Sequence, residues 1–223
     1  MSDDLQHLLA IDDLADDLRG ILEWAIRFKQ DPERDYDFKP LDELSIGCIY
    51  EKPSTRTRVS FEVGINKLGG QPLTLLKNDI QMGKSETIAD TAAVLSRFLD
   101  GITYRCFGHD MVETLAEHAT VPVINGLSDL LHPCQVLADL QTMQEEFGDD
   151  LEGRRVAWIG DGNNMATSWG LGAASDNIEW YGIIVMRSSK NRAATMHPAH
   201  DDHAQIWING EQVLDVGGSA NLS

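Results

Sequence analysis

The sequence has few cysteines and no long apolar run. Cys48, Cys106 and Cys134 are the only three cysteines in 223 residues, and a sparse, odd set of this kind excludes a disulfide framework and is typical of a reducing compartment. No stretch is long enough to span a bilayer, and residues 1–4 lack the basic and apolar regions of a signal peptide. We therefore expect a soluble, cytoplasmic protein.

Basic residues are also scarce. Lys and Arg number 18 against 36 Asp and Glu, which gives a formal net charge of -18. A surface with this balance repels polyanions, so we expect neither nucleic acid nor a membrane among the partners. A chain of 24.7 kDa can form one large or two small domains, and two are slightly favoured.

Residues 51–58, Glu-Lys-Pro-Ser-Thr-Arg-Thr-Arg, form the most distinctive stretch. They follow a strand-like run at 45–50 and precede an amphipathic pattern, so they begin a helix whose first N–H groups lack partners and favour an anion. Ser54, Thr55 and Thr57 add hydroxyls, and Arg56 adds a planar fork that matches phosphate oxygens. A capped helix whose arginines face water is the alternative, but the clustering favours a phosphate cradle.

Strand and helix patterns alternate along the first two thirds of the chain. Apolar spacing predicts helices at residues 12–29, after the cradle and at 136–147, and a capping box from Thr87 to Asp90 predicts one there. In the helix after the cradle, which Gly69 and Gly70 end, the side chains expected to face inward are Val59, Phe61, Val63, Ile65 and Leu68. Strands are predicted at 45–50, 73–76, 102–104 and 121–124. This alternation predicts a parallel sheet with helical crossovers, an α/β fold.

Polar side chains follow all four predicted strands. The cradle follows the first strand, Gln81 the second, Arg105 ends the third, and His132-Pro133-Cys134-Gln135 follows the fourth. Because ligands bind beyond the carboxyl ends of parallel strands, these loops can converge on one anionic ligand. Taken singly, Arg105 could be a surface arginine and His132 a turn or cap residue, and the spacing alone does not direct His132 at Cys134 as a nucleophile.

The organisation restarts beyond residue 150. A strand at 154–159 turns through 160–164 into a helix near 165–174, but Met165 stands where a dinucleotide fingerprint needs its third glycine. Asn163 and Asn164 either face a cleft at this strand end or cap the helix. Farther on, a strand at 183–186 and a hairpin at 205–214 with an Asn-Gly turn are predicted.

The histidines near the end of the sequence do not form a recognisable metal motif. The spacing of these residues is not that of a known closed site, so a solvated loop is favoured and no metal is expected. The set comprises His197, His200 and His203 with Asp201 and Asp202.

Two motifs resemble the aspartate/ornithine carbamoyltransferase family: Ser54-Thr55-Arg56-Thr57-Arg58-x-Ser60-Phe61-Glu62 and His132-Pro133-Cys134-Gln135-x-Leu137-Ala138-Asp139-Leu140. The runs from Asp90 to Arg97 and from Gly160 to Asn164, and the Cys of the second motif, are more similar to the ornithine-using members. The resemblance covers roughly residues 1 to 174.

The resemblance implies a reaction and its residues. Carbamoyl phosphate would transfer its carbamoyl group to the δ-amine of ornithine, giving citrulline and phosphate in arginine metabolism, with no cofactor. Catalysis would come from charge stabilisation at Arg105 and His132, and in this family the equivalent of Gln81 crosses a homotrimer interface. The implied ligands of carbamoyl phosphate are Ser54, Thr55, Arg56, Thr57, Gln81, Arg105, His132 and Gln135, and that of ornithine is Asn164.

The sequence departs from this family after about Ala174. The Ser-Met-Gly loop and the His-Cys-Leu-Pro segment of the second domain are missing, and Met196-His197-Pro198 looks like a remnant of the second. We therefore expect a carbamoyl-phosphate-binding domain at 1–147 and a shortened ornithine-binding domain at 148–223. The alternatives are a carbamoyltransferase for another amine, or a truncated protein that binds carbamoyl phosphate without turnover.

Overall fold

The computed structural model describes residues 5–14, 17–30, 38–175, 179–184, 203–208 and 211–217. The chain divides into two units, Met1–Val185 and Met186–Ser223. Within the described ranges, no helix combines the length and apolarity needed to cross a membrane. The elements are η1 (Ile11–Leu14), α1 (Leu18–Gln30), β1 (Ser45–Tyr50), α2 (Thr55–Lys67), β2 (Gln71–Leu76), α3 (Ile88–Leu95), β3 (Gly101–Arg105), α4 (His109–His118), β4 (Val123–Leu127), α5 (Pro133–Phe147), β5 (Arg155–Gly160), α6 (Asn164–Ser175), β6 (Glu179–Ile184), β7 (His203–Ile208) and β8 (Glu211–Gly217).

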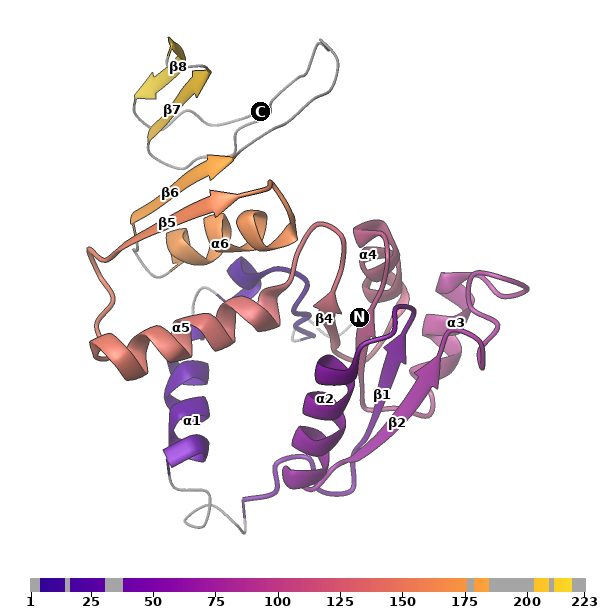
Figure 1. Ribbon diagram of the computed structural model, residues 1–223. Coiled ribbons are helices and arrows are strands. Elements are labelled where there is room, and N and C mark those ends of the chain that lie inside the picture. Colours follow the sequence, from indigo (N-terminus) through magenta and orange to yellow (C-terminus); the bar gives the residue numbers. More distant parts are fainter. Residues whose placement is uncertain are drawn as a thin grey trace. The chain divides into compact units, whose positions relative to one another are not determined.

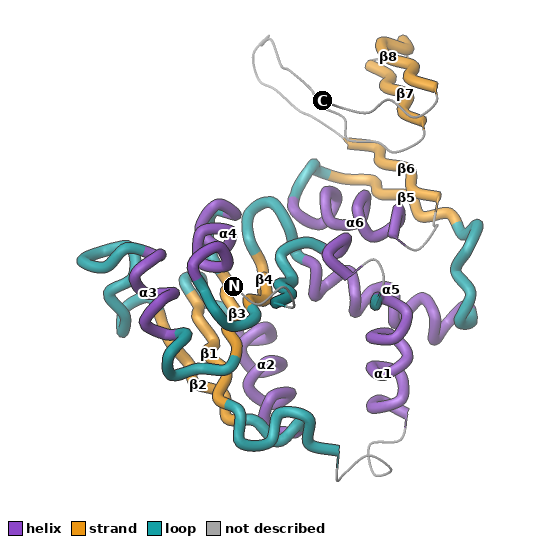
Figure 2. The backbone as a smooth tube through the Cα atoms, turned by 180° about the vertical axis from the view of Figure 1, so that it is seen from behind, coloured by secondary structure: helices purple, strands orange, loops and turns teal. Residues whose placement is uncertain are grey.

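A four-stranded parallel sheet in the order β2-β1-β3-β4 forms the centre of the first unit. Helix α2 packs on one face, and α3 and α4 pack against each other on the opposite face (Figures 1 and 2). The chain leaves β1 in one direction toward β2 and continues from β3 in the other toward β4, so the strand order reverses between β1 and β3. The predicted α/β class with parallel sheets is confirmed.

Strand β1 is buried on both faces, as its position in the sheet requires. Its side chains alternate: Cys48 and Tyr50 pack with Ile65 of α2, whereas Ile49 packs in the larger core with Val112 of α4. Four consecutive residues of this strand, 47–50, are therefore buried. The alternation fixes the register of the strand because a slip by one residue would exchange its two faces.

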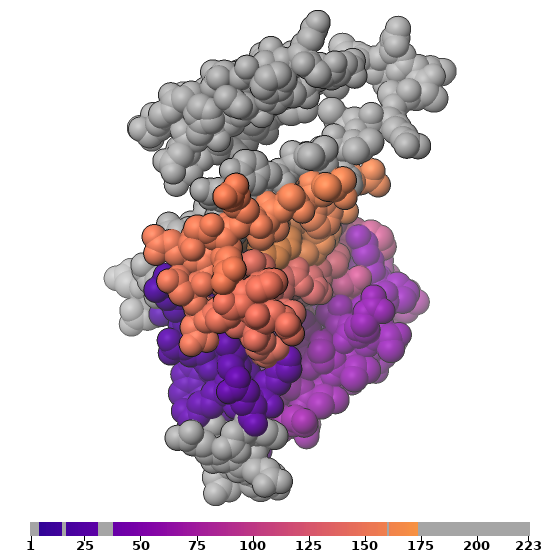
Figure 3. Space-filling view, turned by 60° about the vertical axis from the view of Figure 1, so that its left-hand side comes forward, coloured from indigo at the N-terminus to yellow at the C-terminus, as the bar shows by residue number. Residues whose placement is uncertain are grey.

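A third core joins the N-terminal segment to α5 and α6. Its buried members come from η1, α1, α5, α6 and the loop before β5, and Figure 3 shows the indigo N-terminal segment side by side with the orange segment. The predicted helix at 12–29 is in fact η1 followed by α1, with residues 15–16 outside the described ranges. The core residues are Ile11, Leu14, Leu18, Leu22, Val136, Leu140, Leu151, Trp169 and Ala173.

The segment before η1 closes the β4 edge of the sheet. Leu8 forms a parallel bridge to Ile124, its N–H donates to the Val123 carbonyl at 2.9 Å, and its carbonyl accepts from the Asn125 N–H at 2.7 Å. The buried Asn125 amide also donates to the Leu9 carbonyl at 2.9 Å. An exposed edge with unpaired donors is thereby removed.

Local sequence signals set the ends of α2 and α3. The predicted cap at Thr87 is confirmed, since its hydroxyl accepts from the Asp90 N–H at 3.0 Å. At the end of α2, Gly69 adopts φ 94°, and its N–H and that of Gly70 donate back to Asn66 and Ile65. These two backbone hydrogen bonds form a Schellman motif, which needs a residue that tolerates positive φ.

The inward-facing prediction for α2 is wrong at two positions. Val59 and Val63 are 53% and 48% exposed, whereas Phe61 and Ile65 pack against β1. Residues two apart on a helix lie about 200° apart around its axis, so one set must face away from the sheet.

A second, separate parallel sheet pairs β5 with β6, and β7 and β8 form the predicted antiparallel hairpin. Strand β6 begins and ends earlier than the predicted 183–186. The predicted domain boundary at 147/148 stays a prediction. Of the histidines in the expected solvated loop, His197 and His200 lie outside the described residues, and His203 begins β7, whose side chains are not described.

Removing the side chain of Leu140 should test the third core. Leu140 is 0% exposed, so we expect Leu140→Ala to lower the free energy of unfolding by about 3 kcal/mol because it leaves a cavity. Phe147→Ala, in the same helix but at a 56% exposed position, should cost about 1 kcal/mol or less. Urea unfolding measures both, and equal losses would contradict the packing described here.

Candidate functional site

The predicted cradle is the capped start of α2. Ser54 has extended backbone angles and its hydroxyl accepts from the Thr57 N–H at 3.3 Å. The simple cap that was the alternative is therefore present, yet the Ser54 hydroxyl can still donate and the first N–H groups of the helix remain without intrahelical partners. Thr55 and Arg56 are exposed. The cap and the phosphate cradle are compatible in this geometry.

Arg105 lies next to the cradle because β1 and β3 are neighbours. Tyr50 pairs with Arg105 at the carboxyl ends of these strands, and the Glu51 N–H donates to the Arg105 carbonyl at 2.9 Å. The guanidinium Nη1 then donates to the Thr57 hydroxyl at 3.1 Å. The strand order reverses at this same point, which is where open α/β sheets bind ligands.

His132 is the residue before α5 and lies near Arg105. Burial, together with the positive charge of Arg105, lowers the pKa of His132 to about 4, although the carboxylate of Asp139 opposes the shift. The imidazole is therefore neutral near pH 7. Its Nδ1 and the Nε of Arg105 are buried without a hydrogen-bond partner among the described residues. Such groups are uncommon in native proteins and fit a site that is completed by a ligand.

Three other predicted residues have side-chain hydrogen bonds to partners outside this group. The Gln135 amide donates to Asp139 at 2.9 Å, and the described hydrogen bonds of Gln81 stay within its own loop, to Lys84, Ser85 and Glu86. The Asn164 amide donates to the Ser128 carbonyl at 2.9 Å. The structure thus brings together the cradle, Arg105 and His132.

A buried carboxylate that the sequence reading did not select links the strand ends. Glu51 accepts from Lys77 Nζ at 3.2 Å and from the Phe107 N–H at 3.2 Å, so it connects the ends of β1, β2 and β3. The ammonium groups of Lys52 and Lys77 lie 4.5 and 5.1 Å from the Phe107 ring centroid. The strand-end rule that selected Gln81 could have found Lys77, which directly follows β2.

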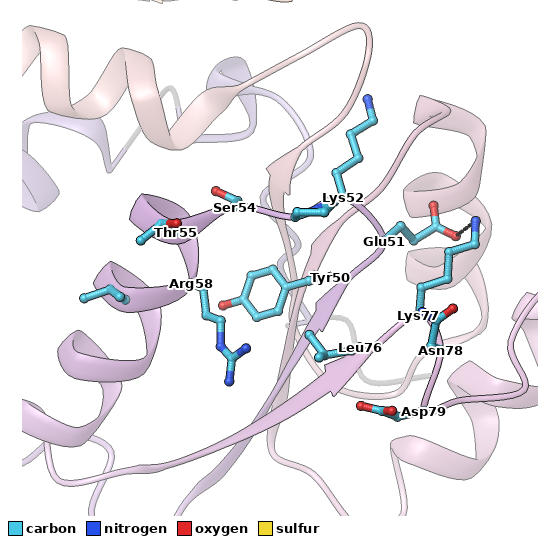
Figure 4. Close-up of a pocket in the computed structure, with 12 residues that line it drawn as sticks. Tyr50, Glu51, Lys52, Ser54, Thr55, Arg58, Leu76, Lys77, Asn78 and Asp79 are labelled. Carbon is cyan, nitrogen blue, oxygen red and sulfur yellow. Dashed lines mark hydrogen bonds and ion pairs between the residues drawn. The ribbon is translucent and has the colours of Figure 1, made fainter.

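A pocket of about 580 Å³ opens on the β2 side of the cradle. Figure 4 shows Tyr50 between α2 and β2, with Ser54 and Thr55 above it and Lys77 bonded to Glu51. The Tyr50 hydroxyl is buried without a partner among the described residues. Arg105 and His132 do not line this pocket, so it is a neighbouring space that shares Ser54 and Thr55 with the cradle.

Ser168 of α6 also contacts the site and was missed. Its hydroxyl accepts from the His132 N–H at 2.7 Å, and the side chain is buried. Its position four residues after Asn164, on the same face of α6, is a signal that helical spacing could have supplied.

The structure argues against Cys134 as a nucleophile, whereas the histidine cluster near the end of the sequence lies largely outside the described residues. Burial raises the pKa of the Cys134 thiol to about 12, and its sulfur lies 3.6 Å from the Asn125 carbonyl oxygen, so it is not an activated nucleophile. Among the described residues, no group of three or more His, Cys, Asp or Glu side chains could hold a metal ion.

Comparison with known proteins gives a consistent group of relatives. Residues 6–145 match the family described as aspartate/ornithine carbamoyltransferase, carbamoyl-P binding domain. Ornithine carbamoyltransferase of Oceanobacillus iheyensis is 51% identical over 168 residues, which are 75% of this chain and 52% of that protein. The enzyme of the same name from Halorhodospira halophila is 49% identical over 74% of this chain and 55% of that protein.

Solved structures show the same similarity. Ornithine carbamoyltransferase from Pyrococcus furiosus aligns with a TM-score of 0.74 at 44% identity, covering 79% of this chain and 57% of that chain. The Burkholderia thailandensis protein gives 0.75 at 39% identity, with 80% and 61% covered. The chain therefore spans only about half the length of the curated relatives it matches.

The lowered pKa of His132 predicts an acid-side loss of stability. The folded-state pKa of about 4 lies below the ordinary value of about 6.5, so the unfolded chain binds a proton first as pH falls. The free energy of unfolding should therefore decline from about pH 6.5 toward pH 4. His132→Asn should flatten this decline in urea titrations at successive pH values, and an unchanged slope would contradict the assignment.

Proposed function

The chain belongs to the aspartate/ornithine carbamoyltransferase family, and we propose that it transfers the carbamoyl group of carbamoyl phosphate to the δ-amine of ornithine, giving citrulline and phosphate. The observation that carries the proposal is the bond from Arg105 to Thr57, which joins a cation from β3 to the helix start after β1. The family match over residues 6–145 supports the first substrate, and the names of the relatives support the second.

The cradle is proposed to hold the phosphate group. Ser54, Thr55, Arg56 and Thr57 offer hydroxyl, guanidinium and backbone N–H donors at the positive end of α2. These donors stabilise phosphate as a leaving group because negative charge accumulates on it as the bond between the carbamoyl carbon and the phosphate oxygen breaks. The δ-amine attacks the carbamoyl carbon in its neutral form, and its proton must leave as citrulline forms.

Arg105 and His132 are proposed to stabilise the carbonyl oxygen. Burial lowers the pKa of Arg105, but a guanidinium stays protonated at neutral pH, so it supplies a full positive charge. His132, neutral because of its lowered pKa, can donate one N–H without adding charge. Gln135 completes the proposed ligands of the carbamoyl end, because its bond to Asp139 uses one amide N–H and leaves the amide oxygen able to accept.

Binding without turnover is the second candidate. The Asn164 amide, the proposed ornithine contact, is bonded to Ser128, and the second parallel sheet has two strands within the described residues. An acceptor site of this kind could bind an amine other than ornithine, or bind no acceptor at all. Screening amines by phosphate release separates these cases.

Arg56→Ala should weaken binding of carbamoyl phosphate because it removes a charged donor from the cradle. A lost charged hydrogen bond corresponds to a rise of about tenfold or more in Kd, measured by calorimetry. Arg97→Ala, which removes an exposed arginine after α3, should leave Kd unchanged.

Citrulline formation by the wild-type chain is the companion measurement. Binding that depends on Arg56 without citrulline at saturating ornithine would favour the non-catalytic candidate. No binding at all would overturn the cradle.

We also propose that the chain acts as a cytoplasmic homotrimer in which Gln81 reaches the cradle of a neighbouring copy. Within one chain, the described bonds of Gln81 stay in its own loop, so a second copy is the proposed route to the ligand. Apolar side chains are exposed around the β2 edge of the sheet, on α2, on β2 and on or beside α3, where a second copy would cover them, and three free cysteines fit a reducing cytoplasm. The exposed residues are Val59, Val63, Leu73, Val94 and Phe98.

Mixing two inactive variants tests the shared site. Gln81→Ala and Arg105→Ala should each lose citrulline formation. After co-refolding in equal amounts, about a quarter of the sites should contain both native residues, because each residue then comes from either variant at random. Recovery of activity supports the shared site, whereas a mixture as inactive as its components would contradict it.

A further inference from the structure

We propose that Ser168 is a positioning residue that fixes His132 beside Arg105 and links it to Asn164. The proposal rests on the function given above, because it assigns His132 to the carbamoyl end and Asn164 to the acceptor end. Ser168 itself touches neither proposed substrate. It acts through the residues at both ends of the site.

Ser168 holds the backbone of His132 at the start of α5. Its backbone N–H donates to the Ser168 hydroxyl at 2.7 Å, and its side chain makes no cap bond at the start of α5. Within the described part of the chain, the Nδ1 atom has no hydrogen-bond partner. The ring direction is therefore set by the backbone and by packing, and Ser168 is the side chain that bonds this backbone.

Ser168 also connects His132 to Asn164. The Ser168 hydroxyl donates to the Asn164 carbonyl at 2.6 Å, so its proton is used there and its lone pair is free to accept from His132. The Asn164 amide donates to the Ser128 carbonyl at 2.9 Å. Asn164 and Ser168, one turn apart on α6, therefore hold the two ends of the loop between Ser128 and His132.

The hydrogen bonds of Ser128 and Ser168 are buried. Ser128 and Ser168 are 0% and 1% exposed, and within the loop the Ser128 hydroxyl accepts from the Leu131 N–H at 3.0 Å. Water cannot readily replace a partner removed from such a place, so the loss of one bond leaves an unsatisfied donor. The loop must then shift, and His132 shifts with it.

The charges around His132 report such a shift. Arg105 of β3 lowers the pKa of the imidazole and Asp139 of α5 raises it, while burial lowers it most. A ring released from its position becomes more hydrated and moves relative to both charges. Its titration is therefore a readout that a general loss of stability in the folded protein does not imitate.

The experiment compares Ser168→Ala with Thr167→Ala in the full chain. Thr167 is a matched control because its hydroxyl also bonds the carbonyl four residues earlier, that of Asn163, at 3.2 Å, but it is exposed. The imidazole signals are followed by NMR against pH, and His132→Asn assigns the signal of His132.

We expect His132 to titrate near pH 4 in the wild type and in Thr167→Ala, and at clearly higher pH in Ser168→Ala. Ser168→Cys, which keeps nearly the same volume but accepts hydrogen bonds poorly, should shift the same way and provides a second variant if Ser168→Ala does not fold. Unchanged titration in the folded variants, or an equal shift in Thr167→Ala, would overturn the proposal.

Steady-state kinetics of citrulline formation provides an independent test. Loss of one buried bond that orients His132 should lower kcat for citrulline about tenfold, a larger factor than any rise in KM for carbamoyl phosphate, because the phosphate cradle is untouched. A rise in KM with unchanged kcat would contradict a positioning role. If the wild type forms no citrulline, the proposed function fails, but the NMR titration still decides whether Ser168 positions His132.

Discussion

The parallel pairing of β1 with β3 is the constraint on which the site depends. The two strands end together at Tyr50 and Arg105, and the chain then leaves them toward opposite sides of the sheet. One exit becomes the helix start that can hold an anion, and the other leaves a cation beside it. This pairing brings Thr57 and Arg105 into contact although they lie nearly fifty positions apart in the sequence.

The sequence predicted most of what is local and part of what is not. The capped start of α2, the Thr87 cap and the strands carry their signals within a few residues, so periodicity and turn chemistry sufficed. Arg105 and His132 were predicted to lie near the start of α2 because a parallel sheet gathers strand ends, and Arg105 does contact Thr57 there. Val59 was misplaced because hydrophobicity alone does not say which stripe of a helix faces inward. Ser168 was missed because its bond to His132 spans 36 residues, and only its spacing from Asn164 gave a local signal.

The charge distribution suits a small anionic ligand. The chain carries 36 acidic and 18 basic residues, yet several basic side chains lie at the carboxyl ends of β1, β2 and β3. Two of them are ion-paired, Lys77 with Glu51 and Arg58 with Glu62, and the others can draw a small anion inward while the acidic surface repels larger polyanions. The set at the strand ends comprises Lys52, Arg56, Arg58, Lys77, Lys84 and Arg105.

The edge pairing of Leu8 has a consequence for how the protein is made. Residues 7–9 bond to residues 123–125 across a separation of 116 positions, and synthesis proceeds from the N-terminus. The segment that completes the sheet edge must therefore wait on the ribosome until β4 has emerged. It is translated before β4 but can dock only after β4, and closing a loop of this length has an entropic cost that local contacts do not have.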